Sequence, residues 1–446
     1  MPKDLWDLTL STESAVAGEQ YVLGVEKLLS ANVGAEEALG RALAADPDFA
    51  LAHAARARAL QLRGALGEAR AAAARGVELV PSATRRERGH VEAIALNIEP
   101  DMPRTLAHVL EHLREFPRDG LVLSLASGIF GLIGFSGRRD RNEVQLDLLD
   151  GLALSYGDDW WFLNAHGFAC TEANRRTRGR RLIERALHLN PRNGHAAHGL
   201  AHVCYEGNAS EEGTAFLRPW LADYDKASQL HCHLSWHLAL FELALGRSEN
   251  AWTLYDDHIR PTNSYGSPLI TLSDSVSLLW RCRLWDKERG TVGWDELREF
   301  ARRSFPAPSL AFADAHAVMA FAAYGDHAGA SARIDELRRA EQEGRQPGGR
   351  IAADVAEAMA AFAQGKDDTV IRLLAPVVSD LVRVGGSHAQ RDVFEETLLG
   401  AYLRSGRTEA AEALFRERLD RRPSARDRAW LRPPTPPPAS WGSAGQ

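Results

Sequence analysis

The chain has 446 residues, of which 45% are hydrophobic and 25% charged, and its formal net charge is −7. This composition is typical of a soluble globular protein, and the acidic charge argues against a nucleic-acid-binding surface, which concentrates lysine and arginine. The first residues lack the basic-then-apolar order of a secretion signal, and we find no run of about 18 apolar residues that could span a membrane. We therefore expect a cytoplasmic protein that binds neither nucleic acid nor a membrane.

Four cysteines lie far apart in the sequence and form no CxxC pair: Cys170, Cys204, Cys232 and Cys282. This spacing fits neither a disulfide framework nor a thiolate metal site. We expect four reduced thiols on helix faces, in keeping with a cytoplasmic protein.

Prolines that follow helical patterns divide the chain into repeats. Pro47 and Pro81 lie 34 residues apart, and the apolar residues before each of them recur with the period of a helix. Proline ends a helix because it lacks the backbone N–H and clashes with the preceding turn. Similar helix ends recur at or near Pro117, Gly157, Pro191, Asp225, Pro261, Pro306, Gly344, Gly385 and Pro423.

The repeats predict an all-α fold, because no segment alternates between apolar and polar residues as a strand does. We expect a tetratricopeptide-repeat-like (TPR-like) α-α superhelix, a solenoid of about eleven helix pairs. In such a solenoid the first helix of each pair lines the concave side and the second lies outside. We expect one solenoid domain over residues 1–430, and a disordered, proline-rich tail over residues 431–446.

A histidine motif occurs twice in the repeat register. His198-x-x-x-His202 is followed by His233-x-x-x-His237, with an offset of 35 residues for both members of the pair. Residues four apart share one face of a helix, so each pair presents two imidazoles on one side. A plain structural repeat does not need this arrangement, and we predict that the four histidines face one site.

Other polar and aromatic candidates also fall on predicted first helices: His166, Glu206, Trp236, Asp274, Asp314, His316, His388, Arg391 and Asp392. Residues at the same depth of successive first helices form a band along the concave wall, and a curl of about one turn would close that band into a pocket. Histidines on predicted second helices or in loops are expected at the surface: His108, His112, His188, His258 and His327.

The histidine pairs leave three interpretations open. In the first, they are buried histidines whose ring nitrogens bond to neighbouring carboxylates or carbonyls. In the second, they are ligands of a divalent metal, and imidazole suits Zn, Cu, Fe and Ni. In the third, they are acid/base or ligand-binding groups that act without a metal. Our candidate catalytic residues are His198, His202, His233, His237, Asp274 and His388. Our candidate ligand-binding residues are His166, Glu206, Trp236, Asp314, His316, Arg391 and Asp392.

The segment 385–392 is dense in groups that can act in a site. Ser387 is a candidate N-cap, and the glycines before it allow a close backbone approach. Arg391 is a candidate clamp for a carboxylate or a phosphate. A buried pair between Arg391 and Asp392 is the alternative.

The chain resembles the tetratricopeptide repeat protein 38 family over roughly residues 5–425. The resemblance rests on NAH at 164–166, HGLAHVCYE at 198–206, HLSWHLALFELALG at 233–246 and GGSHAQRDVFEETLL at 385–399. It implies an all-helical, TPR-like, soluble protein and no particular reaction. These motifs coincide with the polar residues chosen above, which favours an inward-facing site.

Two functions are compatible with this pattern. The first is a solenoid whose concave His/Asp/Glu/Arg pocket binds a small polar ligand, with metal-assisted or acid/base enzyme chemistry. The second is a TPR scaffold that binds a peptide or a partner protein without catalysis. The first predicts an enclosed site and the second an open groove.

Overall fold

The computed structural model describes residues 1–99, 101–285 and 289–431. Over these residues it contains 23 α-helices and no strand, apart from an isolated β-bridge between Lys3 and Thr9. The predicted all-α class is confirmed. The predicted tail over residues 431–446 lies outside the described residues except for Leu431.

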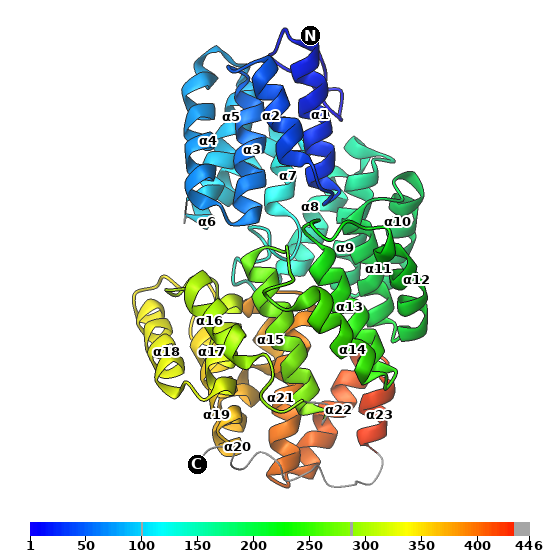
Figure 1. Cartoon of the computed structure of the whole chain (residues 1–446), viewed down its shortest axis with the longest axis vertical. Helices are drawn as coiled ribbons and strands as arrows, with labels where there is room; N and C mark the ends of the chain where they lie inside the picture. Colours follow the sequence, from blue (N-terminus) through cyan, green and yellow to red (C-terminus); the bar gives the residue numbers. More distant parts are fainter. Residues whose placement is uncertain (100, 286–288, 432–446) are drawn as a thin grey trace.

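The helices follow one another as eleven pairs and a terminal helix, the organisation of a TPR-like solenoid (Figure 1). The first helices of the pairs are α1 (Ala15–Leu29), α3 (Ala50–Arg63), α5 (Arg85–Ile98), α7 (Gly120–Ala126), α9 (Trp160–Glu172), α11 (Gly194–Glu206), α13 (His231–Ala244), α15 (Pro268–Leu284), α17 (Ala311–Tyr324), α19 (Ile351–Ala363) and α21 (His388–Arg404). The second helices are α2 (Ala35–Ala45), α4 (Leu66–Leu79), α6 (Met102–Glu115), α8 (Arg141–Tyr156), α10 (Arg176–Leu189), α12 (Ser210–Ala222), α14 (Ser248–Leu254), α16 (Trp294–Ser304), α18 (His327–Gln342), α20 (Asp367–Leu374) and α22 (Thr408–Arg421). The terminal helix is α23 (Ala425–Trp430), and short irregular turns are η1 (Val80–Ser82), η2 (Tyr255–Ile259) and η3 (Ala375–Val384).

Prolines mark the helix ends as the sequence predicts. Six of them lie two residues beyond the last residue of a helix: Pro47, Pro81, Pro117, Pro191, Pro306 and Pro423. At this place the missing N–H removes no helical hydrogen bond, and the ring stops the helix from continuing.

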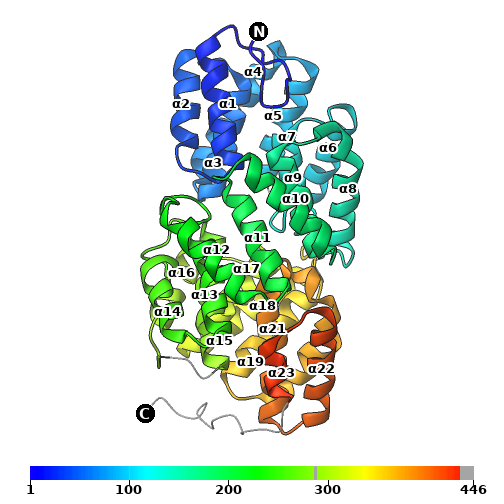
Figure 2. The ribbon, with the colours of Figure 1, turned by 90° about the vertical axis from the view of Figure 1, so that its right-hand side faces the viewer.

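The first helices from α9 to α21 form a continuous inner wall whose last helix returns to earlier ones. From α9 to α19 each first helix packs on the next one, and α21 then packs on α19, α15 and α11. Figures 1 and 2 show α21, in orange, among the green and yellow helices of this half of the molecule. Tyr205 on α11 donates a hydrogen bond to Asp392 on α21 at 2.6 Å, and Trp280 on α15 donates one to Thr397 at 3.0 Å. The chain therefore makes the closing curl on which the predicted pocket depends.

Two large hydrophobic cores and one small cluster (Leu163, Ala186 and Ala196) lie along the described part of the chain. One gathers buried residues between Trp6 and Ala173, and the other gathers Ala31 and buried residues between Ile183 and Phe415. Figures 1 and 2 show the blue N-terminal helices at one end of the long axis and the yellow to red helices at the other. A single domain over residues 1–430 stays a prediction.

The loop between α7 and α8 joins the early part of the chain to its C-terminal helices. Arg383 donates from Nε to the carbonyl oxygen of Gly137 at 2.8 Å. Gly137 has a φ of +71°, and a side-chain Cβ there would lie 2.2 Å from the carbonyl oxygen of Pro347. Only glycine allows this backbone conformation and this close approach.

Candidate metal centre in the closed interior

The two histidine pairs meet in the interior of the solenoid. Helix α11 contributes His198 and His202, and α13 contributes His233 and His237. One ring nitrogen from each of the four histidines can be chosen so that all lie within 4.8 Å of one another. The repeat register of the motif therefore places four imidazoles around one point.

Local sequence positions the first pair. Asn193 caps α11 by accepting a hydrogen bond from the backbone N–H of Ala196 at 3.2 Å. Gly199 lies between the two histidines, and a Cβ there would lie 2.8 Å from Oδ1 of Asn164 and 3.0 Å from Cδ1 of Ile183. Glycine at this position therefore lets α11 pack closely on α9 and α10, while His198 and His202 face the cluster.

The nitrogen separations are close to those of a metal site. His198 Nε2 lies 3.0 Å from His202 Nε2 and 3.0 Å from His233 Nε2. A tetrahedral zinc ion with Zn–N bonds of about 2.0–2.1 Å separates its ligand nitrogens by about 3.3–3.4 Å. The two distances from His198 Nε2 would each lengthen by a few tenths of an ångström if these nitrogens shared one ion.

Two buried carboxylates lie behind the rings, and one of them orients its histidine by a hydrogen bond. Asp274 Oδ2 lies 2.7 Å from His233 Nδ1, and Glu172 Oε1 lies 3.4 Å from His202 Nδ1. The carboxylate of Asp274 accepts a hydrogen bond, so the ring hydrogen of His233 sits on Nδ1 and its Nε2 lone pair points into the cluster. This carboxylate–histidine arrangement is the one that orients histidine ligands in metal sites.

The hydrogen count in the cluster favours a cation. His233 directs an Nε2 lone pair at His198 Nε2, His202 Nε2 lies equally close to that atom, and a neutral His198 has at most one hydrogen on it. Whichever ring nitrogen of His198 carries the hydrogen, one of the two 3.0 Å contacts therefore lacks a hydrogen bond of its own. Neither ring nitrogen of His237 has a hydrogen-bond partner among the described residues, although the ring is fully buried. A bound divalent ion would satisfy all four rings, so the donor set fits such an ion.

The charge states also suit metal binding. Burial and the neighbouring imidazoles hold the pKa values of His198 and His237 well below the usual histidine value, so both rings are neutral at pH 7. Burial alone would raise the pKa of Glu172, but contact with His202 and the charges of Arg391 and His388 lower it to about 2. The site therefore combines neutral imidazole ligands with an ionised carboxylate behind one of them.

Aromatic rings separate the cluster from water. Trp236 stacks on His233 with ring centroids 5.3 Å apart, and Phe168 stacks on His198 at 5.3 Å. His202 and His237 are 0% exposed and His198 is 8% exposed. All four histidines are therefore buried side chains, with at most 8% of a residue exposed.

The N-terminus of α21 reaches the cluster through Glu172. The backbone N–H of His388 donates to Glu172 Oε2 at 3.1 Å, and its ring nitrogen Nδ1 lies 2.9 Å from Glu206 Oε1. Burial opposes the charged form of His388, but Glu206 outweighs this effect and raises the pKa of the ring. The predicted N-cap at Ser387 is confirmed, as part of a capping box with Gln390. His388 has a side chain that is 22% exposed, so it lies between the interior and the surface.

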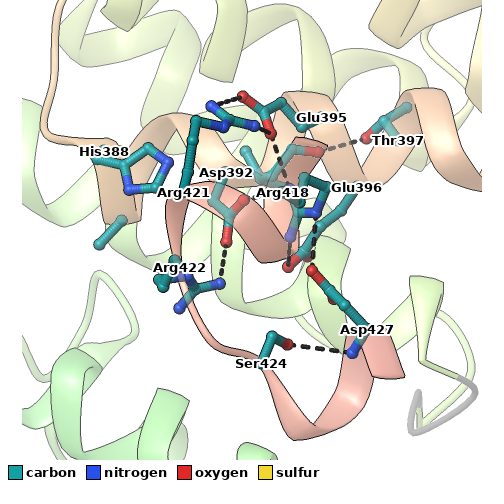
Figure 3. A network of polar contacts seen from close by, with 12 residues as sticks. His388, Asp392, Glu395, Glu396, Thr397, Arg418, Arg421, Arg422, Ser424 and Asp427 are labelled. Carbon is teal, nitrogen blue, oxygen red and sulfur yellow. Dashed lines mark hydrogen bonds and ion pairs between the residues drawn. The ribbon is translucent and has the colours of Figure 1, made fainter. Parts of the chain in front are cut away.

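Asp392 and the acidic residues after it belong to a buried ion-pair network with α22 and α23 (Figure 3). Asp392 pairs with Arg418 and with Arg422, the latter at 2.9 Å. Arg418 also contacts Glu395 and Asp427, each at 2.9 Å. These contacts hold the last helices against α21.

Arg391 uses the NH1 group of its guanidinium on the backbone, donating to the carbonyl oxygen of Gly386. A clamp on a ligand would need other N–H groups of the same side chain. The proposed clamp at Arg391 and the ligand-binding role of Asp392 therefore stay predictions.

Three further candidates have partners of their own. Asp314 pairs with Arg333 at 2.6 Å, and His316 Nδ1 donates to the carbonyl oxygen of Phe312 at 2.7 Å. His166 lies 2.7 Å from Asp150. Their roles in ligand binding remain predictions.

Sequence reasoning missed Glu172, although a repeat signal was present. Glu172 is the last residue of α9, as Glu206 is the last residue of α11, and the two lie 34 residues apart. The expectation of a surface position for His112 was wrong. The residue is buried, with Nε2 at 2.9 Å from Asp119, because α6 turns this face toward α5 and α7.

All four cysteines are unpaired and buried. Burial raises the pKa values of Cys204 and Cys282 to about 12. Neither thiol is a nucleophile at neutral pH, because the reactive species is the thiolate.

Taken together, the chain is an all-α, TPR-like solenoid with a buried four-histidine cluster. No family model matches the chain. Among solved structures it is similar to a chain in the structure of Naa15/Naa10 bound to HypK-THB, with 11% identity and a TM-score of 0.24 over 92% of this chain and 64% of that one. This chain therefore spans less than two thirds of that chain, and the low TM-score says nothing about function. None of the described helices combines the length and the apolar character needed to span a membrane.

Proposed function

We propose that this protein binds one divalent transition-metal ion through His198, His202, His233 and His237, and that a small polar ligand adds to it in a fifth coordination position. The observation that carries this proposal is the position of His198 Nε2, 3.0 Å from two other imidazole nitrogens. Zinc is the first candidate, and copper, iron and nickel also suit imidazole ligands. The two negative charges of Glu172 and Asp274 would balance the charge of the ion.

Different side chains would have different roles at such a site. A bound ion would polarise a ligand oxygen and lower the pKa of coordinated water. Asp274 would hold the ring of His233, and Trp236 and Phe168 would exclude bulk water. His388, paired with Glu206 at the edge of the interior, is suited to proton transfer.

The alternative function is a TPR scaffold that binds a peptide or a partner protein without catalysis. A groove for a peptide needs an exposed inner face, and the burial of the four histidines speaks against such a groove at these positions. Membership of the tetratricopeptide repeat protein 38 family is part of the proposal, and it rests on the motifs quoted above.

Metal analysis tests the proposal. The chain is purified without a histidine tag, and its metal content is measured by mass spectrometry before and after incubation with Zn²⁺. We expect about one ion per chain, and a higher midpoint of thermal unfolding with the ion than with a chelator.

Two variants make the test specific. His237→Ala removes a buried ring of the cluster and should abolish stoichiometric binding, whereas His188→Ala, at an exposed position, should retain it. Circular dichroism shows whether each variant is folded, and His237→Gln serves if His237→Ala is not. A folded wild-type chain that binds no ion, or equal binding by the histidine-cluster and control variants, would overturn the proposal and favour the scaffold.

A further inference from the structure

A surface cleft lies where three distant parts of the chain meet. It has a volume of about 520 Å³ and is lined by the end of α1, the turn between α10 and α11, and the turn between α12 and α13. Clefts of this size hold small molecules in many proteins. None of the four clustered histidines lines it, so the cleft is separate from the proposed metal centre.

Hydrogen bonds between the three parts fix the walls of the cleft. Asn32, in the turn after α1, donates from Nδ2 to the carbonyl oxygen of Arg192 at 3.0 Å. The hydroxyl of Tyr224 donates to the carbonyl oxygen of Ala31, whose φ is +56°. A non-glycine residue in the left-handed region is strained, and it persists here because the surrounding contacts hold it. The cleft is therefore a built feature of the fold.

Two cations line the cleft without a carboxylate partner. Lys27 on α1 and Arg192 in the turn before α11 form no ion pair with any residue that the structure describes. One NH2 group of Arg192 donates to the backbone carbonyl oxygen of Asp223 at 2.5 Å. The other N–H groups of this guanidinium and the ammonium group of Lys27 can serve a carboxylate that enters the cleft.

Three carboxylates line the same cleft, and they are equally unpaired. Glu26, Asp223 and Asp225 form no ion pair with the described part of the chain. Opposite charges attract, yet no ion pair spans the cleft, so the cations and the carboxylates lie too far apart to satisfy one another. Three carboxylates and two cations give its walls a net charge of −1. A ligand with charges of both signs and a net charge of +1 would balance them.

Apolar side chains complete the lining. Leu23, Val33 and Ala222 border the cleft beside the charged groups. A hydrocarbon chain between two charged ends can lie along such a surface, as the methylene groups of lysine do in proteins.

We propose that this cleft binds a free basic amino acid, with lysine and ornithine as the simplest members of the class. The carboxylate of the ligand accepts from Lys27 and Arg192. Its two ammonium groups donate to Glu26, Asp223 and Asp225, and its methylene chain packs on the apolar part of the lining. The inference does not depend on the metal centre, and it needs no bond to be made or broken.

Three small molecules that differ by one charged group test the proposal. L-lysine carries a carboxylate and two ammonium groups, norleucine lacks the ammonium group of the side chain, and cadaverine lacks the carboxylate. Calorimetric titration and the midpoint of thermal unfolding measure binding of each to the full chain at low salt. We expect saturable binding of lysine, and binding at least about ten-fold weaker for the other two, because each loses a charge-assisted contact.

Matched variants locate the binding. Lys27→Met and Asp223→Asn should each weaken lysine binding at least about ten-fold. Lys366→Met and Asp420→Asn, at exposed positions outside the cleft, should leave it unchanged. Neither Lys27 nor Asp223 has an ion-pair partner to lose, so both variants should fold, and circular dichroism checks that they do.

Charge reversal gives a result that a purely structural role would not. Lys27→Glu replaces the cation with a further carboxylate, so it should weaken binding of lysine and strengthen binding of cadaverine. An equal response to lysine and norleucine, no saturable binding of lysine up to about 10 mM, or equal lysine binding by Lys27→Met and Lys366→Met would each overturn the proposal.

Discussion

Asp274→Asn is the sharpest perturbation of the proposed metal centre. Asp274 is 0% exposed and its Oδ2 lies 2.7 Å from His233 Nδ1. Asparagine keeps the shape of the side chain, and its amide oxygen can still accept the ring hydrogen. The change therefore removes one negative charge and weakens the hold on the imidazole.

The magnitude follows from the distance between the carboxylate and the ion. The 2.7 Å contact, the width of the ring and a metal bond of about 2.1 Å together place the charge about 7 Å from a divalent ion. Coulomb's law then gives about 1–5 kcal/mol for effective dielectric constants between about 80 and 20. Loss of a carboxylate behind a histidine ligand typically weakens metal binding about 10–100-fold, or about 1.4–2.7 kcal/mol, which lies within this range.

Competition with a chromophoric chelator measures this loss. Asp314→Asn is the matched control, because Asp314 is equally buried but pairs with Arg333. We expect Asp274→Asn to bind Zn²⁺ about 10–100-fold more weakly than the wild type, and Asp314→Asn to bind it within about two-fold of the wild type. Unchanged affinity in Asp274→Asn, or an equal loss in both variants, would refute the role of Asp274.

Two further predictions concern stability. Burial lowers the pKa of His316 from an ordinary value of 6.5 to about 4. Between these values the unfolded chain takes up a proton at this ring and the folded chain does not. The free energy of unfolding therefore falls as the pH decreases from 6.5 toward 4. The unfolding midpoint should drop less between pH 7 and pH 5 in His316→Gln than in the wild type, and equal drops would contradict this. Arg418→Met removes the guanidinium shared by Asp392, Glu395 and Asp427 and should cost about 3–5 kcal/mol in denaturant unfolding, against about 0.5 kcal/mol or less for the exposed Arg416→Met. A small loss in Arg418→Met would mean that Arg422 alone satisfies Asp392.

Local chemistry made the helices predictable. Proline at Pro47, Pro81, Pro117 and Pro191 ends each helix two residues earlier, because the ring and the missing N–H act within one turn. The N-cap at Ser387 was predicted for the same reason, since its side chain bonds to the backbone N–H of Gln390, three residues on.

The histidine cluster was predictable because two periods combine in the sequence. The helical period puts His198 and His202 on one face, and the repeat offset puts a second pair beside the first. Glu172 carried the same repeat signal through Glu206, but a single acidic residue at a helix end is too common a feature to be chosen without the fold.

The sequence by itself therefore determined the helices, their order and the inward face of the histidine pairs. Only the tertiary structure decided that α21 closes on α11 and α15, that α1 shares a cleft with the turn before α13, and that Arg418 neutralises Asp392. The curl of a solenoid is the sum of small rotations at many helix contacts, and each rotation depends on how side chains from distant segments pack. No local sequence pattern encodes the sum of these rotations. The sequence therefore predicted an enclosed site only on the condition that the solenoid curls by about one turn.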